Sequence, residues 1–143
     1  MAWDKLFAVP ILRSIIRFFG AFPVDASKAD KSAYVNALRT LNDNKALIIF
    51  PEGTRSRDGT VKDFKLGVAR IALKTNACIV PVTIVGAYEA FSRHRLLPRP
   101  WKISVYYHKP IRIARHEFSD ANDRNEFSHK ITAQVTEQIN SRL

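Results

Sequence analysis

The sequence predicts an α/β fold, with a single mixed sheet flanked by helices. Two observations predict it. A continuous apolar run of strand length occurs at Ala46–Phe50, a second buried strand is predicted at Cys78–Val85, and segments with helical periodicity lie before and after them. Alternation of helices with buried strands is typical of sheets covered by helices. With 143 residues, 46% of them hydrophobic, the chain can bury a core, and we expect one domain over residues 1–143.

The apolar stretch from Leu6 to Val24 opens the chain, but Pro10, Arg13 and Arg17 interrupt it. It therefore lacks the uninterrupted apolar run that a membrane span needs, and it has no signal-peptide pattern. Residues 11–19 predict an amphipathic helix, either at a membrane interface or facing a protein core. Its apolar face would comprise Leu12, Ile15, Ile16 and Phe19.

The next elements are predicted from local signals. Phe22–Val24 favours a short strand, and Ser27 followed by Asp30 resembles a capping box before a second helix. Asn42–Asn44 would end that helix. Its predicted core face comprises Ala33, Tyr34, Ala37, Leu38 and Leu41.

The second half predicts a strand at 46–50, a helix at Leu66–Thr75, and strands at Cys78–Val85 and Lys102–Tyr107. A closing helix begins near Asp120, because apolar residues then recur every fourth position, at Phe127, Ile131, Val135 and Ile139. Cys78 is the single cysteine. Its apolar neighbours predict a buried thiol, and the cysteine count suggests an intracellular, reducing compartment.

The 23 basic and 13 acidic residues give a net charge of +10. This charge favours anionic partners: phospholipid surfaces, nucleic acids or phosphorylated substrates. From Ala90 to His116 no acidic residue occurs, and a solvated face and an anion-binding surface both remain open there. The cations of this stretch are Arg93, Arg95, Arg99, Lys102, Lys109, Arg112 and Arg115.

The segment that carries chemistry is residues 50–59, directly after a predicted buried strand, where α/β sheets usually hold ligands. Gly53 lets the backbone approach an anion, and the Thr54 hydroxyl can donate to phosphate oxygens. Arg55 offers a planar fork for bidentate phosphate contact, and Glu52 could orient it or accept hydrogen bonds itself. A plain polar turn with a salt bridge is the alternative.

Residues 50–56, Phe-Pro-Glu-Gly-Thr-Arg-Ser, resemble the signature of the glycerolipid acyltransferases, the family of 1-acylglycerol-3-phosphate acyltransferases. The blocks 64–67, 79–82 and 109–111 resemble later parts of the family pattern, and block 20–25 resembles the part before the signature helix. The resemblance covers about residues 5–115 and implies a glycerol-3-phosphate acyltransferase-like fold.

The resemblance implies transfer of an acyl group from acyl-CoA or acyl carrier protein to the hydroxyl of a phosphate-bearing lysophospholipid, in phospholipid biosynthesis. Glu52, Gly53, Thr54 and Arg55 would bind the acceptor phosphate, and Pro81 would shape the acyl or acceptor pocket. No metal or prosthetic group is implied. The expected location is cytoplasmic, peripherally associated with an anionic membrane surface.

This sequence departs from the family pattern at the catalytic base. The family uses a histidine followed, after four intervening residues, by an aspartate, and none of the four histidines has this partner. His94, His108, His116 and His129 are followed at that spacing by Arg99, Ile113, Ala121 and Gln134. We therefore expect this motif to lie before Met1 and assign no catalytic residue. Ala26 also stands where the family commonly has a phosphate-binding arginine, with Lys28 nearby.

Three functions remain open: an acyltransferase whose base lies elsewhere, a non-catalytic module that binds membranes or lipid phosphate, and a nucleic-acid binder. The third depends only on the charge and on Trp101, Tyr106 and Tyr107 among basic residues, so it ranks last.

Overall fold

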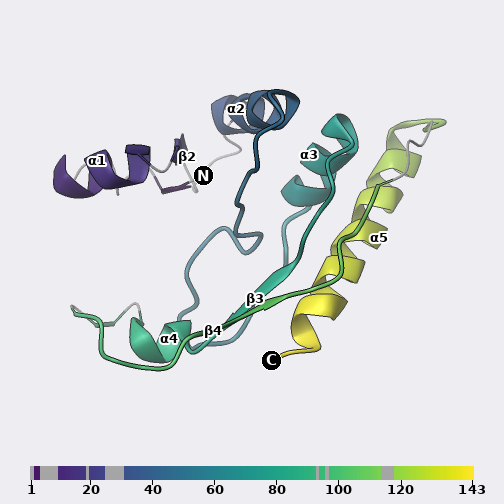
Figure 1. Ribbon diagram of the computed structural model, residues 1–143. Coiled ribbons are helices and arrows are strands. Elements are labelled where there is room, and N and C mark those ends of the chain that lie inside the picture. The colour runs from purple at the N-terminus through teal and green to yellow at the C-terminus, as the bar shows by residue number, and fades with distance from the viewer. Residues whose placement is uncertain are drawn as a thin grey trace. The chain divides into compact units, whose positions relative to one another are not determined.

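The computed structural model describes residues 2–3, 10–18, 20–24, 31–92, 94–95, 97–113 and 118–143. Two compact units divide the chain: unit 1 is Met1–Phe50 and unit 2 is Pro51–Leu143. Figure 1 shows the elements of each unit. The expectation of one domain over residues 1–143 stays a prediction, and the two units are described separately below.

Unit 1 contains two short strands and two helices. β1 (Ala2–Trp3) pairs in parallel with β2 (Pro23–Val24). The helix α1 (Pro10–Phe18) lies between them in the chain, and α2 (Lys31–Asn42) follows β2. The predicted strand and both predicted helices of this region are confirmed. The predicted capping residues Ser27 and Asp30 lie outside the described residues, as do Ala26 and Lys28.

Left-handed residues end these helices. After α1, Gly20 has φ of 71°, and the amides of Gly20 and Ala21 donate to the carbonyls of Arg17 and Ile16. After α2, Asn44 repeats the same two-bond pattern. This Schellman motif satisfies the last carbonyls of a helix and favours glycine or asparagine at the left-handed position. The local sequence therefore determines where both helices end.

The core face of α2 is narrower than predicted. Ala33 and Ala37 are buried and Leu38 and Leu41 are half-buried, but Tyr34 is 38% exposed. Ala33 and Ala37 lie four residues apart on one face of the helix, and Tyr34 lies at the edge of that face, about 100° from Ala33. The prediction for Tyr34 was wrong.

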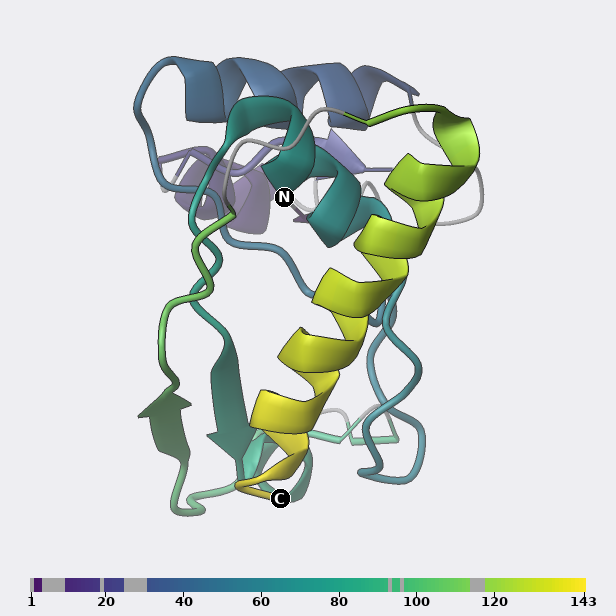
Figure 2. The ribbon, with the colours of Figure 1, turned by 90° about the vertical axis from the view of Figure 1, so that its right-hand side faces the viewer.

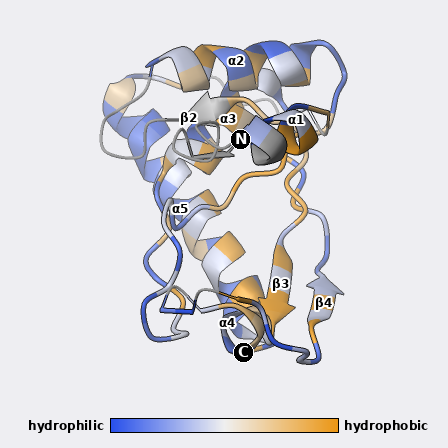
Figure 3. Cartoon of the chain, turned by 90° about the vertical axis from the view of Figure 1, so that its left-hand side faces the viewer, coloured by the Kyte–Doolittle hydropathy of each residue, from blue (hydrophilic) through white to orange (hydrophobic). Residues whose placement is uncertain are grey.

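Unit 2 contains α3 (Gly67–Thr75), β3 (Val82–Val85), α4 (Ala87–Ala90), β4 (Ser104–Tyr107) and α5 (Ala121–Asn140). β3 pairs antiparallel with β4 from Val82 opposite Tyr107 to Val85 opposite Ser104. A single bridge joins Ile79 to Ile111, so the predicted strand 78–85 is confirmed only over its second half. Figure 3 shows that β3 is one of the most hydrophobic segments of the unit.

The core of unit 2 lies where α5 packs against α3 (Figure 2). Asp120 caps α5, because its carboxylate accepts a hydrogen bond of 2.8 Å from the Asp123 amide. The predicted closing helix is thus confirmed, although Phe127 is only half-buried. The buried cluster comprises Ala69, Ile111, Ile131, Val135 and Ile139.

Two expectations were wrong. The described residues form two two-stranded sheets instead of a single mixed sheet, and residues 46–50 extend without a strand ladder. Ile48 is 74% and Phe50 63% exposed. An apolar run favours a strand only where a neighbour pairs with it, and that neighbour is a long-range property. At the coarser level, helices with small sheets, the fold is α/β.

Cys78 is exposed rather than buried. Its thiol lies 3.9 Å from the carbonyl oxygen of Ile79, which is a weak contact. Side chains alternate sides in extended backbone, so in this segment Ile79 packs against the core while Cys78 points outward.

Candidate functional site

The loop from Pro51 to Leu66 connects the extended residues 45–50 to α3 and belongs to unit 2. The Lys65 amide donates 3.0 Å to the Pro51 carbonyl and closes the base of the loop. Gly53 turns the chain with φ of 71°, a value that residues with a Cβ rarely adopt. The signature residues therefore lie on a closed loop whose shape depends on Gly53.

Lys62 crosses this loop. Its backbone amide donates 3.0 Å to the Glu52 carboxylate, and its ammonium donates 3.1 Å to the Thr54 hydroxyl. Both contacts span eight residues or more, so they bring the two sides of the loop together. Glu52 accepts from the backbone here, which is one of the two roles predicted for it.

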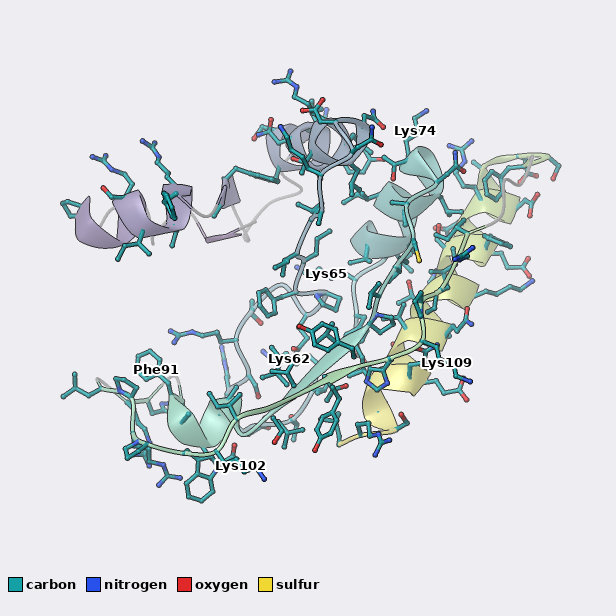
Figure 4. All side chains as sticks on the ribbon, in the orientation of Figure 1. Lys62, Lys65, Lys74, Phe91, Lys102 and Lys109 are labelled. Carbon is teal, nitrogen blue, oxygen red and sulfur yellow. The ribbon has the colours of Figure 1, made fainter. Side chains whose placement is uncertain are left out.

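Lys65 lies over Gly53. A Cβ built on Gly53 would be 3.0 Å from the Lys65 Nζ and 3.1 Å from its Cε. Figure 4 shows Lys62 and Lys65 extending from the same loop ahead of α3. Two ammonium groups therefore converge on Gly53 and Thr54.

Arg55 is exposed beside these residues. Among the described residues, no ion pair involves Glu52 or Arg55, so the salt bridge expected under the alternative, a plain polar turn, does not form. Arg55, Lys62 and Lys65 supply three cations, and two carboxylates, those of Glu52 and Asp58, accept hydrogen bonds in this loop. Such an excess of positive charge around exposed donors suits an anionic group such as a phosphate.

The tip of the loop is a second turn, organised by Asp58. Its carboxylate accepts from the Thr60 hydroxyl at 2.6 Å, the Thr60 amide at 3.0 Å and the Ser56 hydroxyl at 3.2 Å. These bonds, the Thr60 hydroxyl above all, lower the pKa of Asp58 from 3.8 to about 2. The turn is therefore held by an ionised carboxylate across the physiological range.

Tyr88 of α4 anchors this tip. Its hydroxyl donates 3.0 Å to the Arg57 carbonyl, and a Cβ on Gly59 would be 3.1 Å from the Tyr88 ring. The lack of a Cβ on Gly59 lets the ring approach the backbone closely. The loop is thus attached at its base by Lys65 and at its tip by Tyr88.

Pro81 is buried just before β3, and its carbonyl accepts 3.0 Å from the His108 amide. No described hydrogen bond connects it with residues 52–55. The structure brings Glu52, Gly53 and Thr54 together, leaves Arg55 at their exposed edge, and gives Pro81 a place in the β3–β4 region instead.

The described histidines have no acidic partner. His94 and His129 are exposed, and His108 Nε2 lies 2.8 Å from the Thr83 hydroxyl. The Thr83 hydroxyl in turn donates 3.1 Å to the Ile139 carbonyl. None of these three imidazoles is oriented by a carboxylate as a general base requires.

Within the described residues, no cluster of three His, Cys, Asp or Glu side chains could hold a metal ion. Nor is any described helix long and apolar enough to cross a bilayer. A small hollow of about 10 Å³, room for one water, lies beside Lys65. It is lined by Pro51, Phe64, Lys65, Val68, Ala69, Ile131, Thr132 and Val135.

Sequence reasoning missed the roles of Lys62, Lys65 and Tyr88. Lys65 lies in a block that resembles the family pattern, which was a signal that could have identified it. Lys62 and Tyr88 carried no local signal, because their contacts join residues 8 and 31 positions apart.

A family model described as "Acyltransferase" matches residues 1–85, which include the whole loop and Pro81. The chain is 38% identical over 105 residues to a 1-acyl-sn-glycerol-3-phosphate acyltransferase of Cocos nucifera, covering 73% of this chain and 34% of that protein. It is 27% identical over 143 residues to the enzyme of that name from Bacillus subtilis, covering 100% of this chain and 65% of the relative.

The crystal structure of the 1-acyl-sn-glycerophosphate (LPA) acyltransferase PlsC from Thermotoga maritima is also similar, with 31% identity and a TM-score of 0.67. The match covers 95% of this chain and 54% of that one. The chain thus spans between about a third and two thirds of these relatives. The matched family model covers more than half of the chain, and the chain belongs to the acyltransferase family.

Proposed function

We propose that this chain takes part in transferring an acyl group from acyl-CoA or acyl carrier protein to the free hydroxyl of 1-acylglycerol-3-phosphate, giving phosphatidic acid. The names of the similar proteins support this substrate. The observation that carries the proposal is the convergence of Lys62 and Lys65 on Gly53 and Thr54. It places two ammonium groups beside the exposed turn at Gly53 and Thr54.

In this proposal each loop residue has a defined part. Arg55 contacts the acceptor phosphate in a bidentate manner, and Lys65 supplies a point charge above the Gly53 turn. The Thr54 hydroxyl donates to a phosphate oxygen. Glu52 is a positioning residue, because it holds the Lys62 backbone in place. Pro81, buried just before β3, shapes the acyl or acceptor pocket.

The chemistry requires a base that removes the acceptor hydroxyl proton as its oxygen attacks the thioester carbonyl. The C–S bond then breaks, and the thiolate leaves and takes up a proton. The thioester is already activated, so this reaction needs no metal or prosthetic group. The described histidines lack a carboxylate partner, and we propose that the base is supplied by residues outside this sequence.

We also propose a peripheral membrane location on the cytoplasmic side, with α1 at the bilayer interface. In α1, Ile15 is 50% and Phe18 86% exposed, and Arg13 and Arg17 are exposed as well. Exposed apolar side chains beside cations are typical of helices that lie in the plane of an anionic interface. The acceptor is itself a membrane lipid, so this location brings it to the loop.

Replacing Arg55 with Ala tests the phosphate site. The half-saturating concentration of lysophosphatidic acid should rise at least about tenfold, because even one of the two hydrogen bonds to a charged group contributes about 1.5 kcal/mol or more. Arg57→Ala is the matched control, since Arg57 is exposed on the same loop and contacts Tyr88 only through its backbone. The measurement is acyl transfer in an active, upstream-extended chain. Equal kinetics for both variants would remove Arg55 from the site.

A non-catalytic module that binds lipid phosphate is the second candidate, favoured by the lack of a His-x4-Asp motif in the sequence. Thioester-dependent acylation should be measured with this chain and with one extended upstream in the reading frame. Turnover only in the extended chain supports the enzyme. Lysophosphatidic acid binding by both chains, with turnover by neither, supports the module.

A further inference from the structure

The loop after α4 exposes an unusual combination of side chains. Its apolar members Phe91, Leu97, Trp101 and Ile103 are 44%, 78%, 52% and 52% exposed. The cations Arg95, Arg99 and Lys102 are also exposed between them, and no acidic residue occurs from position 90 to 116. We call these seven residues the 91–103 surface. Several large apolar side chains exposed on one short loop indicate an interaction site.

Arg99 holds this loop in a defined shape. Its amide donates 2.9 Å to the Ala90 carbonyl, and its Nε donates 2.7 Å to the Glu89 carbonyl. The guanidinium then lies over the Trp101 ring, 4.5 Å from its centroid. The exposed aromatic ring is therefore fixed against α4 by a cation.

Gly86 lets the same loop pack closely against the start of α4. It has φ of 86°, and the Lys102 carbonyl and the Trp101 ring lie against its Cα where a Cβ would clash. Figure 1 shows α4 and the following loop at one end of unit 2, beyond the end of β3 and the start of β4. The apolar and cationic side chains are thus presented by a supported, protruding loop.

We propose that the 91–103 surface docks onto an anionic phospholipid bilayer. It deepens the proposed function, since it adds a contact from unit 2 to the peripheral location proposed for α1. Tryptophan prefers the headgroup level of a bilayer, and arginine and lysine are attracted to anionic headgroups. Leu97, the most exposed of the four apolar residues, reaches the acyl boundary.

Nucleic acid fits this surface less well. Bases need free aromatic faces and hydrogen-bonding partners, but one face of Trp101 already carries Arg99. Leu97 and Ile103 offer no hydrogen bonds to a base. A bilayer would contact the apolar side chains through its acyl chains and the cations through its headgroups. It therefore explains both kinds of exposed side chain.

Tryptophan fluorescence tests the contact directly. The chain has two tryptophans, so Trp3→Phe leaves Trp101 as the sole emitter. With mixed phosphatidylglycerol and phosphatidylcholine vesicles, the Trp101 emission should shift to shorter wavelength and be quenched by brominated acyl chains. Phosphatidylcholine vesicles should change it little. Unshifted, unquenched emission from vesicle-bound protein would overturn the proposal.

Substitutions at exposed positions test the surface by vesicle flotation. Lys102→Gln should weaken partitioning about fivefold and Leu97→Ser about tenfold. Lys74→Gln and Leu143→Ser are matched controls, because Lys74 lies on α3 (Figure 4) and Leu143 is 65% exposed. Equal losses in variants and controls would contradict a local surface.

A single-stranded oligonucleotide, followed by fluorescence anisotropy, provides the competing outcome. Binding that depends on Leu97 and Lys102, without any vesicle binding, would replace the bilayer with nucleic acid. The test is independent of catalysis. If Trp101 is quenched but no acyl transfer is measured, the proposed function is contradicted and the bilayer contact is not. If acyl transfer is measured but Trp101 is not quenched, only the bilayer contact is contradicted.

Discussion

Gly53 shows how one residue can determine the shape of the candidate site. Its φ of 71° is costly for any residue with a side chain, and the Lys65 ammonium occupies the position that a Cβ would approach. Lys65 is flexible and can move away, so the main cost of a substitution is backbone strain together with a displaced cation. Stability and ligand binding should therefore both respond at this position.

Gly53→Ala is expected to lower the free energy of unfolding by about 1 kcal/mol. Gly67→Ala should instead raise it by about 0.5 kcal/mol, because Gly67 begins α3 and a Cβ there would contact nothing. Urea denaturation of both variants measures the difference. If Gly53→Ala were as stable as Gly67→Ala, the strained turn would not exist in solution.

Asp58 makes the tip of the loop sensitive to acid. Its folded pKa of about 2 is below the ordinary value of 3.8, so the folded state favours the ionised form. The stabilisation is complete above the ordinary pKa and is lost as the pH falls through the folded value. Thr60→Val removes the strongest hydrogen bond and should raise the pKa toward 3.8. An NMR titration of the Asp58 carboxyl carbon measures this, and an unchanged midpoint would contradict it.

At the scale of elements, Thr83 joins β3, β4 and the end of α5. Its hydroxyl donates to the Ile139 carbonyl, so it must accept from His108, whose Nε2 therefore carries the proton. Thr83 is 2% exposed. A buried polar group that joins three elements is costly to remove, because its former partners then lose their hydrogen bonds.

Thr83→Val keeps the shape of the side chain and should cost about 2 kcal/mol of unfolding free energy. Thr136→Val serves as control, since the Thr136 hydroxyl bonds only to the Thr132 carbonyl within α5. That carbonyl keeps its place in the helix, and the variant should stay within about 0.5 kcal/mol of the original. Chemical denaturation compares them, and equal losses would show that the three-element contact contributes nothing.

The elements divide clearly into those that local sequence predicts and those that it does not. The helices α2, α3 and α5 follow from apolar spacing and from Asn or Asp at their ends, which are local signals. Residues 46–50 also carry a strong local signal, the β propensity of their apolar side chains, and still form no strand ladder. The short helix α4 was not predicted, since four residues are too few for a periodic pattern.

For the whole molecule, the net charge of +10 predicts salt-sensitive binding to anionic vesicles. Raising the salt from about 0.01 M to about 1 M shortens the Debye length from about 30 Å to about 3 Å. Flotation with phosphatidylglycerol vesicles should fall steeply over this range, and phosphatidylcholine vesicles should retain little protein throughout. Retention that does not change with salt would show that the charge plays no part.

The sequence by itself determined the family, the main helices and the segment 50–59 as the candidate site, because each depends on residues close together in the chain. Only the tertiary structure decided that Lys62 and Lys65 converge on Gly53, that Glu52 accepts from a backbone amide, and that Cys78 is exposed. The physical reason is the distance along the chain over which each signal acts. Periodicity and turn preference act over a few residues, whereas a side chain's contacts depend on how the intervening loop closes.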